Sequence, residues 1–201
     1  MINYQKLLFH IEHIGRKQYG QSYALHKEDF PYIIRLLAYF MNDEVKCQEL
    51  GIDLKKGILL TGPMGVGKTT WFRLMQHIMH KEQKFYYTTC RDVNFEFFRR
   101  GFDVIEKYTK GLPNELQRCS ICFDDLGTEN NVKYFGNECN VMQEILLSRY
   151  DLFTDYGHKT HLTTNLSATE IENYYTARVR SRLRHMMNVL AILPDRKDKR
   201  S

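Results

Sequence analysis

A glycine-rich run in the first third of the chain has the residue types and spacing of a phosphate-binding loop. It fits the pattern G-x-x-x-x-G-K-T and comprises Gly62, Pro63, Met64, Gly65, Val66, Gly67, Lys68, Thr69, Thr70. Glycines let the backbone curl so that its N–H groups point inward, and the dipole of a following helix favours anions at the same place. We therefore predict that this run binds ATP, with Lys68 at the β- and γ-phosphates and the Thr69 hydroxyl on Mg²⁺. The competing interpretation is a glycine-rich turn without a ligand.

An acidic pair, Asp124 and Asp125, follows the apolar run 120–123, which is typical of a short buried strand. Open parallel sheets bind their ligands at the carboxyl ends of strands. Asp124 is expected to hold Mg²⁺ through water, and Asp125 to orient or deprotonate the attacking water. An isolated acidic pair after a strand is more often a turn or a helix cap. The phosphate loop upstream favours the metal-site interpretation.

Two further polar segments supply candidate catalytic residues. Asn165 ends the next predicted strand and is suited to contact a γ-phosphate or the attacking water, although a turn before a helix cap is an equal alternative. A later segment carries four arginines within seven residues, at Arg178, Arg180, Arg182 and Arg184. An arginine can stabilise transition-state charge on a γ-phosphate, often from a neighbouring subunit. The alternative for at least two of them is a solvated cationic helix face that also contacts nucleic acid.

Strands and helices alternate along the chain in a way that can position these residues. Apolar or β-branched runs predict strands over 58–60, 85–89, 120–123, 159–164 and 189–193. Helical spacing and capping residues predict helices over 2–14, from Asp29 to Phe40, over 71–79, from Asp92 to Arg99, from Asp103 to Tyr108, from Asn137 to Phe153, after Ser167, and over 176–186. Gly15 and Gly20 are expected to bracket a linker. The alternation predicts an α/β fold with a mainly parallel sheet covered on both faces.

Composition is consistent with a single folded α/β chain in a reducing compartment. The chain has 201 residues, 43% of them hydrophobic, and a net charge of +5, which is compatible with a polyanionic partner. Its five cysteines form no paired framework, and Cys119 and Cys122 are interpreted as buried thiols rather than zinc ligands. No apolar stretch is long enough to span a membrane, so we predict no membrane partner and a cytoplasmic location.

Four segments together resemble the DnaC/IstB-like branch of the AAA+ ATPases over about residues 50–200. They are the phosphate loop 62–69, the acidic motif 123–129 (FDDLGTE), the segment 164–167 (TNLS) and the segment 178–183 (RVRSRL), in the order of the family. The resemblance implies an α/β P-loop NTPase with an AAA+ core, whose five parallel strands have the order 5-1-4-3-2. We expect a short helical N-terminal extension over 1–49 and the ATPase domain over 50–201. No sizeable C-terminal lid is expected, because only a charged tail follows the fifth strand.

The same resemblance implies the roles of individual residues. It assigns Asp124 to the metal, Asp125 to hydrolysis and Asn165 to sensing the γ-phosphate. Arg182 is the first choice for an arginine finger that acts on the ATP of a neighbouring subunit, and Arg178 is the second. Members of the branch form rings or spirals and carry single-stranded DNA along the inner face. The aromatic and basic segment 94–110 fits such a path, with Phe98, Arg99, Arg100, Lys110 as candidate DNA contacts. For the phenylalanines, a core-packed helix pair is the competing interpretation.

These features predict an ATP-dependent DNA replication protein, a helicase loader that binds ATP, Mg²⁺ and single-stranded DNA and associates with a replicative helicase. Its hydrolysis of ATP is expected to be slow and stimulated by DNA or by the partner. One alternative is a transposition helper ATPase with a transposase as its partner. Another is a nucleotide-gated interaction module with negligible hydrolysis, which Asp125 in place of a glutamate keeps open. Each hypothesis predicts a homo-oligomer that assembles on ATP or DNA.

Overall fold

The computed structural model describes residues 2–109, 120–129, 132–134 and 137–193, and the chain forms two compact units. The first unit comprises Met1–Leu54 and Gly67–Lys84, and the second comprises Lys55–Val66 and Phe85–Ser201. The chain therefore passes from the second unit into the first between Val66 and Gly67, inside the predicted phosphate loop.

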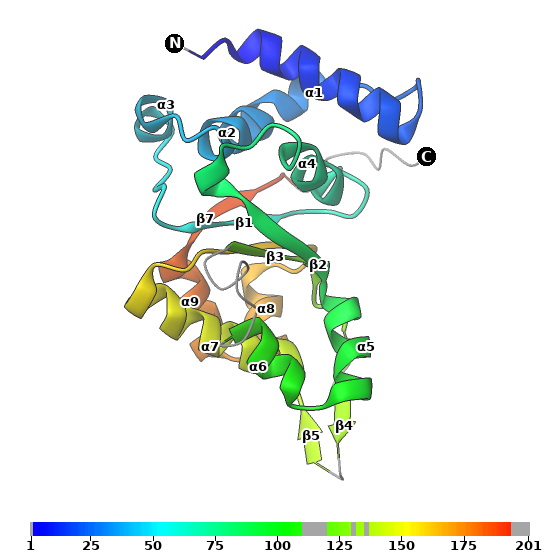
Figure 1. The fold of residues 1–201 in the computed structure, drawn as a ribbon, viewed down its shortest axis with the longest axis vertical. Helices are drawn as coiled ribbons and strands as arrows, with labels where there is room; N and C mark the ends of the chain where they lie inside the picture. The colour runs from blue at the N-terminus through cyan, green and yellow to red at the C-terminus, as the bar shows by residue number, and fades with distance from the viewer. Residues whose placement is uncertain (1, 110–119, 130–131, 135–136, 194–201) are drawn as a thin grey trace. The chain divides into compact units, whose positions relative to one another are not determined.

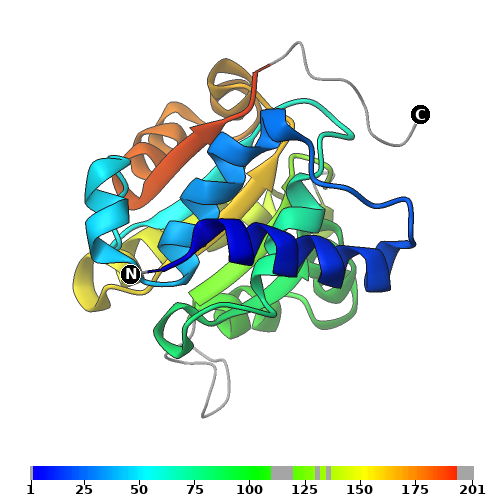
Figure 2. The same cartoon turned by 90° about the horizontal axis from the view of Figure 1, so that it is seen from above.

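The first unit is helical and is organised around α2. Its elements are α1 (Tyr4–Tyr19), η1 (Lys27–Asp29), α2 (Phe30–Phe40), α3 (Glu44–Glu49), α4 (Lys68–Met75) and η2 (Lys81–Gln83). α2 is apolar on most of its surface, so it can be buried by α1, α3 and α4. The ring of Phe40 meets that of Phe72 on α4 edge-on at 5.8 Å. The start of α1 lies beside the end of α2 (Figure 2), where the Tyr4 hydroxyl donates to Asp43 at 2.8 Å.

The predicted end of the first helix in this unit is wrong. The first helix does not end before Gly15 but continues to Tyr19, and Gly15 is buried within it. A Cβ at this position would lie 2.2 Å from the ring of Tyr23, so glycine is required for close packing rather than for a helix end. The segment after residue 43, for which no helix is predicted, forms α3, and its N-cap Asp43 accepts a hydrogen bond from the N–H of Lys46 at 3.0 Å.

The second unit contains a five-stranded parallel sheet with the order β2-β3-β6-β1-β7. The strands are β1 (Gly57–Thr61), β2 (Phe85–Thr89), β3 (Ser120–Leu126), β6 (Thr160–Thr164) and β7 (Met187–Ala191). In chain order of these five strands the arrangement is 5-1-4-3-2, so the predicted sheet is confirmed. Since all strands are parallel, their carboxyl ends lie at one edge of the sheet.

The helices of the second unit lie on one side of its sheet (Figure 1). They are α5 (Cys90–Arg100), α6 (Asp103–Thr109), α7 (Val141–Tyr156), α8 (Ala168–Tyr174) and α9 (Ala177–Met186). Their apolar faces join the sheet in one buried core, which includes Phe97, Phe123, Ile145 and Leu183. Burial of such side chains is the main stabilising contribution to the unit.

Capping residues in this unit follow the predictions in part. Ser167 caps α8 in a capping box with Glu170, as predicted. The cap of α5 is Thr89 rather than Asp92, and the cap of α7 is Asn140 rather than Asn137. Asn137 belongs instead to β5 (Asn137–Cys139), which pairs antiparallel with β4 (Val132–Tyr134). In each case two residues that can cap a helix lie three positions apart, and the sequence alone does not show which of them begins the helix.

Within the described ranges, no helix is both long enough and apolar enough to cross a membrane, and no three His, Cys, Asp or Glu side chains group as metal ligands. Cys122 is buried in β3, as predicted, whereas Cys119 lies outside the described residues.

Candidate nucleotide-binding site

The predicted phosphate loop leaves the carboxyl end of β1 and enters α4 at Lys68. Its three glycines have positive φ angles, +151° at Gly62, +76° at Gly65 and +103° at Gly67. L-residues with side chains rarely adopt such angles, so the glycines are required by the conformation of the loop. A Cβ at Gly62 would also lie 2.7 Å from Cβ of Ile192.

The first turn of α4 provides the features of an anion site. Gly67 is its N-cap and has no side chain to accept hydrogen bonds from the N-terminal amides. Lys68 is buried, at 5% exposure, while Thr69 and Thr70 are half-buried. A largely buried lysine in the first turn of a helix that lacks a side-chain cap suits a polyanion. Among the other loop residues Val66 is buried, whereas Met64 is exposed.

The beginning of the loop is attached to the segment that carries Asn165. The N–H of Gly62 donates to the carbonyl oxygen of Thr164 at 3.3 Å, and the Thr61 hydroxyl donates to the carbonyl oxygen of Leu166 at 2.9 Å. These bonds exist because β1 and β6 are adjacent and in register at their carboxyl ends. The structure thus brings half-buried Asn165 next to the start of the phosphate loop, within the second unit.

Asp124 lies at the carboxyl end of β3, and its carboxylate is oriented by residues that no sequence motif indicates. It is 2% exposed. Its Oδ1 accepts a hydrogen bond from the hydroxyl of Thr163 on β6, and its Oδ2 accepts one from the hydroxyl of Tyr87 on β2, both at 2.5 Å. Hydrogen bonds of this kind hold a carboxylate in one orientation, as a metal-binding or water-binding group requires.

Asp125 has a left-handed backbone, with φ +57°, which is uncommon for a residue other than glycine. Its N–H donates to the hydroxyl oxygen of Thr163 at 2.9 Å. Thr163 therefore binds both members of the acidic pair. Thr163 and Tyr87 lie on the strands that flank β3, and the order of the sheet is the only signal that could have identified them.

The arginines of α9 differ in what they contact. Arg182, the first choice for the finger, donates to the carbonyl oxygen of Leu147 at 3.2 Å, and its guanidinium lies 4.7 Å from the ring centroid of Tyr150. Arg180 forms an ion pair with Glu172. Arg178 is exposed, and no hydrogen bond or ion pair of its side chain with another described residue is found.

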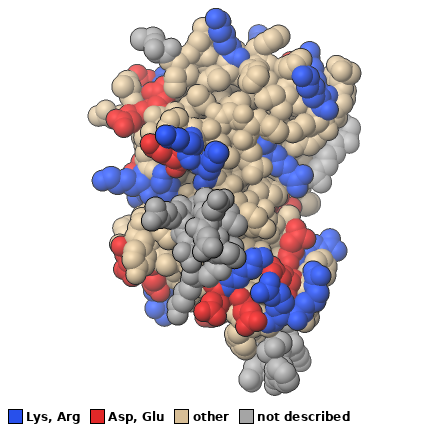
Figure 3. All heavy atoms as spheres, viewed as in Figure 1, with Lys and Arg blue, Asp and Glu red and all other residues tan. Residues whose placement is uncertain are grey.

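The candidate DNA contacts lie on α5, except Lys110, which is outside the described residues. Phe98 is 61% exposed, and Arg99 is exposed beside it. Arg100 donates to Glu96 at 3.1 Å, so part of its charge is neutralised. Phe97 packs in the core, as the alternative interpretation expects for the phenylalanines. Over the region of α5 and α6 in Figure 3, basic and acidic side chains are interspersed.

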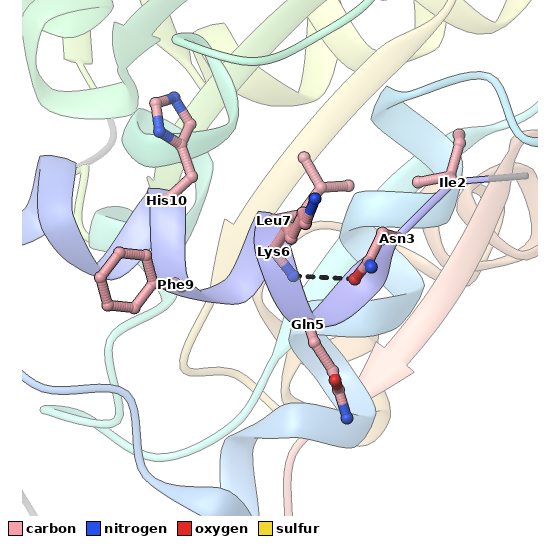
Figure 4. Close-up of a pocket in the computed structure, with 7 residues that line it drawn as sticks. All are labelled: Ile2, Asn3, Gln5, Lys6, Leu7, Phe9 and His10. Carbon is pink, nitrogen blue, oxygen red and sulfur yellow. Dashed lines mark hydrogen bonds between the residues drawn. The ribbon is translucent and has the colours of Figure 1, made fainter.

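A surface hollow on the first turns of α1 is separate from these groups. It belongs to the first unit and is lined by Ile2, Asn3, Gln5, Lys6, Leu7, Phe9, His10. Figure 4 shows that its side chains come from the first turns of α1 and from the two residues before the helix, with the N–H of Lys6 bonded to the Asn3 side chain. None of the predicted site residues lines this hollow.

Sheet order, phosphate loop and acidic strand end define the chain as an α/β P-loop fold of the AAA+ type. No family model matches the sequence, and no curated protein matches it. Among solved structures, the chain is similar to a DnaC helicase loader, with a TM-score of 0.57 and 20% identity over 86% of this chain and 94% of that one. It is also similar to a proposed primosome component from Streptococcus pyogenes serotype M3, with a TM-score of 0.56 and 17% identity over 86% of this chain and 84% of that one. For DnaA from Aquifex aeolicus with bound AMPPCP, the TM-score is 0.54 and the identity is 16%, over 89% of this chain but only 51% of that one. The predicted resemblance is thus confirmed at the level of the fold.

Proposed function

We propose that this chain is an ATP-dependent DNA replication protein of the helicase-loader type, which binds ATP with Mg²⁺ and single-stranded DNA. The observation that carries the proposal is the complete G-x-x-x-x-G-K-T loop between β1 and α4, whose three glycines have positive φ angles. A glycine-rich turn without a ligand requires neither the buried lysine nor the uncapped helix start. The fold similarity to a DnaC helicase loader and to nucleotide-bound DnaA supports the same function.

In this proposal the residues divide the chemistry of ATP hydrolysis among them. The loop amides and Lys68 bind the phosphates, and Thr69 and Asp124 hold Mg²⁺, which neutralises charge on the phosphate oxygens. Asp125 orients the attacking water and accepts its proton, while Asn165 hydrogen-bonds the water or the γ-phosphate. Thr163 supports this arrangement because it fixes both Asp124 and the backbone of Asp125.

Arg178 is a better candidate than Arg182 for the finger that acts on a neighbouring subunit. A finger must leave its own subunit's surface and enter another active site. Arg182 is bound by three groups of α7: the Leu147 carbonyl, the Tyr150 ring, and the carboxylate of Asp151 at 3.6 Å. Arg178 is exposed on the first turn of α9.

Single-stranded DNA is proposed to lie along the exposed face of α5. Phe95 and Phe98 on α5 are 47% and 61% exposed and lie three residues apart, and Phe102, just after the end of α5, is 58% exposed. Arg91 lies over the ring of Phe95 at 5.3 Å, and Arg99 lies on the same face. Exposed aromatic rings between cations bind single strands by stacking on bases and by contacts to phosphates.

Replacing the loop lysine tests the proposal. Lys68→Ala should weaken binding of ATP·Mg²⁺ by about 100-fold or more, because it removes a charge-assisted contact to the β- and γ-phosphates. Asp124→Asn should retain nucleotide binding and lose magnesium-dependent turnover. Lys84→Ala, at an exposed lysine after η2, is the matched control. Isothermal calorimetry and a phosphate-release assay measure the two effects, and unchanged binding by Lys68→Ala would contradict the proposal.

The same assays separate the loader from its alternatives. A loader is expected to hydrolyse ATP slowly, to be stimulated by single-stranded DNA or by its partner, and to capture a replicative helicase. A transposition helper should prefer long duplex DNA and form filaments on it. An interaction module would bind ATP and change its oligomeric state with no turnover under any of these conditions.

A further inference from the structure

Glu129, the last residue of the acidic motif, is a buried carboxylate with no role in the proposed reaction. It is 3% exposed, in the turn that follows β3. Its Oε2 accepts a hydrogen bond from the N–H of Gly127 at 3.0 Å, and its Oε1 accepts one from the hydroxyl of Tyr175. Burial raises the pKa of Glu129, and these hydrogen bonds oppose that shift. A carboxyl group buried at such a cost requires specific partners.

The partner of Glu129 lies at the junction of two helices. Tyr175 is 4% exposed and forms the C-cap of α8, and the next residue, Thr176, is the N-cap of α9. The neighbouring hydroxyl of Tyr174 donates to the main-chain oxygen of Glu129. Two tyrosine hydroxyls therefore attach the turn after β3 to the point where α9 begins.

Asp125 lies in β3, one residue before the strand ends and the turn begins. Its carbonyl oxygen accepts hydrogen bonds from the hydroxyl of Thr128 at 2.7 Å and from the N–H of Thr128 at 3.3 Å. A left-handed aspartate is retained only when its surroundings hold it in place. The hydrogen bonds from Thr128 supply part of such surroundings, and they connect the backbone of Asp125 to the turn that contains Glu129.

We infer that Glu129 is a positioning residue that connects the end of β3, with Asp124 and Asp125, to the start of α9. A change of conformation at one of these two places is then accompanied by a change at the other. The inference rests on the proposed function, in which Asp125 acts on the subunit's own ATP and Arg178 acts on the ATP of the next subunit. The arginine presented to the neighbour then depends on the state of the subunit's own site. Coupling of this kind makes hydrolysis cooperative between subunits.

Two variants weaken this link in different ways. Tyr175→Phe removes the hydrogen bond to Oε1 and leaves the one from Gly127. Glu129→Gln keeps the size of the side chain but has only one oxygen for its two donors. Tyr86→Phe, at a half-buried tyrosine on β2, is the control for loss of a tyrosine hydroxyl in the same unit.

The first measurement is hydrogen exchange of the full chain without nucleotide, so it does not depend on ATPase activity. Amides of residues 123–129 and 174–180 should both exchange about tenfold faster in Tyr175→Phe and Glu129→Gln, as expected for loss of a hydrogen bond to a charged group. Tyr86→Phe should leave both segments unchanged. If exchange over 123–129 is unaltered in both variants, the link does not exist and the inference is wrong.

The second measurement separates coupling from a merely structural role. In both variants the Kd for ATP should stay within about twofold of wild type, while the rate should lose its sigmoidal dependence on ATP concentration. Retained sigmoidality, or a loss of ATP binding, would overturn the inference. A wild-type chain that hydrolyses no ATP would overturn the proposed function, and the exchange measurement would still decide whether the link exists.

Discussion

His161 on β6 shows how a single buried residue links the stability of the fold to pH. It is fully buried, and its Nδ1 accepts a hydrogen bond from the N–H of Ile58 at 3.0 Å. Burial, with smaller contributions from the charges of Lys159 and Arg149, lowers its pKa to about 3. The folded chain therefore keeps this imidazole neutral at pH values where the unfolded chain protonates it, and stability falls as pH decreases from about 6.5 toward 3.

His161→Asn tests this effect, since the Asn side chain offers an oxygen to the N–H of Ile58 but no titrating group. Between pH 6.5 and 5, the wild type should lose about 1.5 kcal/mol more of its free energy of unfolding than the variant. Urea denaturation at the two pH values measures the difference. His13→Asn, at an exposed histidine on α1, is the control. An equal pH dependence in wild type and His161→Asn would refute the assignment.

Local motifs in the sequence predict candidate site residues such as Lys68 and Asp124, but they do not predict the residues that contact these candidates. Thr163 and Tyr87 contact Asp124 from strands that are distant in the sequence. Their positions depend on sheet order and register, which spacing within one segment does not contain. Glu129 is part of a recognised motif, yet its partner Tyr175 becomes evident only from the packing of α8.

At the scale of elements, the sequence predicts strands more reliably than helix boundaries. Each of the five parallel strands lies in a short run rich in apolar, aromatic or β-branched residues, and the resemblance supplies their order. Helix ends depend on which of several capping residues is used, so the spacing predicts Asn137 where Asn140 caps α7. Gly15 is typical of a helix end because glycine is a weak helix former, but the close approach of Tyr23 overrides this propensity.

The exposed face of α5 leads to a prediction about DNA binding. Phe98→Ala should weaken binding of a labelled oligo-dT by about 5- to 100-fold through loss of one base stack. Arg99→Ala should weaken it and reduce the slope of log K against log salt by about one. Arg100→Ala should have a smaller effect, because Arg100 is paired with Glu96. Fluorescence anisotropy at several salt concentrations measures these changes.

An exposed phenylalanine elsewhere provides the control for these α5 variants. Phe9 on α1 is 74% exposed, and Phe9→Ala should leave DNA affinity unchanged. If Phe98→Ala binds like wild type while its circular dichroism is native, α5 is not the stacking surface. An equal effect of all four substitutions would indicate nonspecific binding rather than the proposed face.

At the scale of the whole molecule, each of the two compact units is built from two separate segments of the sequence. The chain enters the second unit at Lys55, returns to the first at Gly67 and leaves it again after Lys84. Packing between segments distant in the sequence determines this division, whereas a boundary near residue 50 rests on linear order alone. The boundary between 1–49 and 50–201 stays a prediction. The phosphate loop contains residues of both units, so the conformation of each unit determines part of the loop.

A mixing experiment tests whether the active site is completed by a second copy of the chain. Arg178→Ala lacks the proposed finger but keeps Asp125, and Asp125→Asn lacks the group proposed to activate water but keeps the proposed finger. Each variant alone should lose nearly all turnover. Mixed in equal amounts with ATP and single-stranded DNA, they should regain about a quarter of the wild-type rate, because one quarter of the head-to-tail interfaces then combine an intact Asp125 with an intact Arg178.

Arg182 supplies the comparison that decides between the two arginines. Its contacts with Leu147, Tyr150 and Asp151 stabilise α9 against α7, so Arg182→Ala should lower the melting temperature more than Arg178→Ala does. If Arg182 were the finger, mixing Arg182→Ala with Asp125→Asn would restore activity, and Arg178→Ala alone would remain active. If neither mixture regains turnover although co-purification of differently tagged chains shows mixed oligomers, each ATP site uses residues of one subunit only. The first outcome would assign the finger to Arg182 instead of Arg178. The second would mean that the proposed mechanism does not require assembly of several subunits.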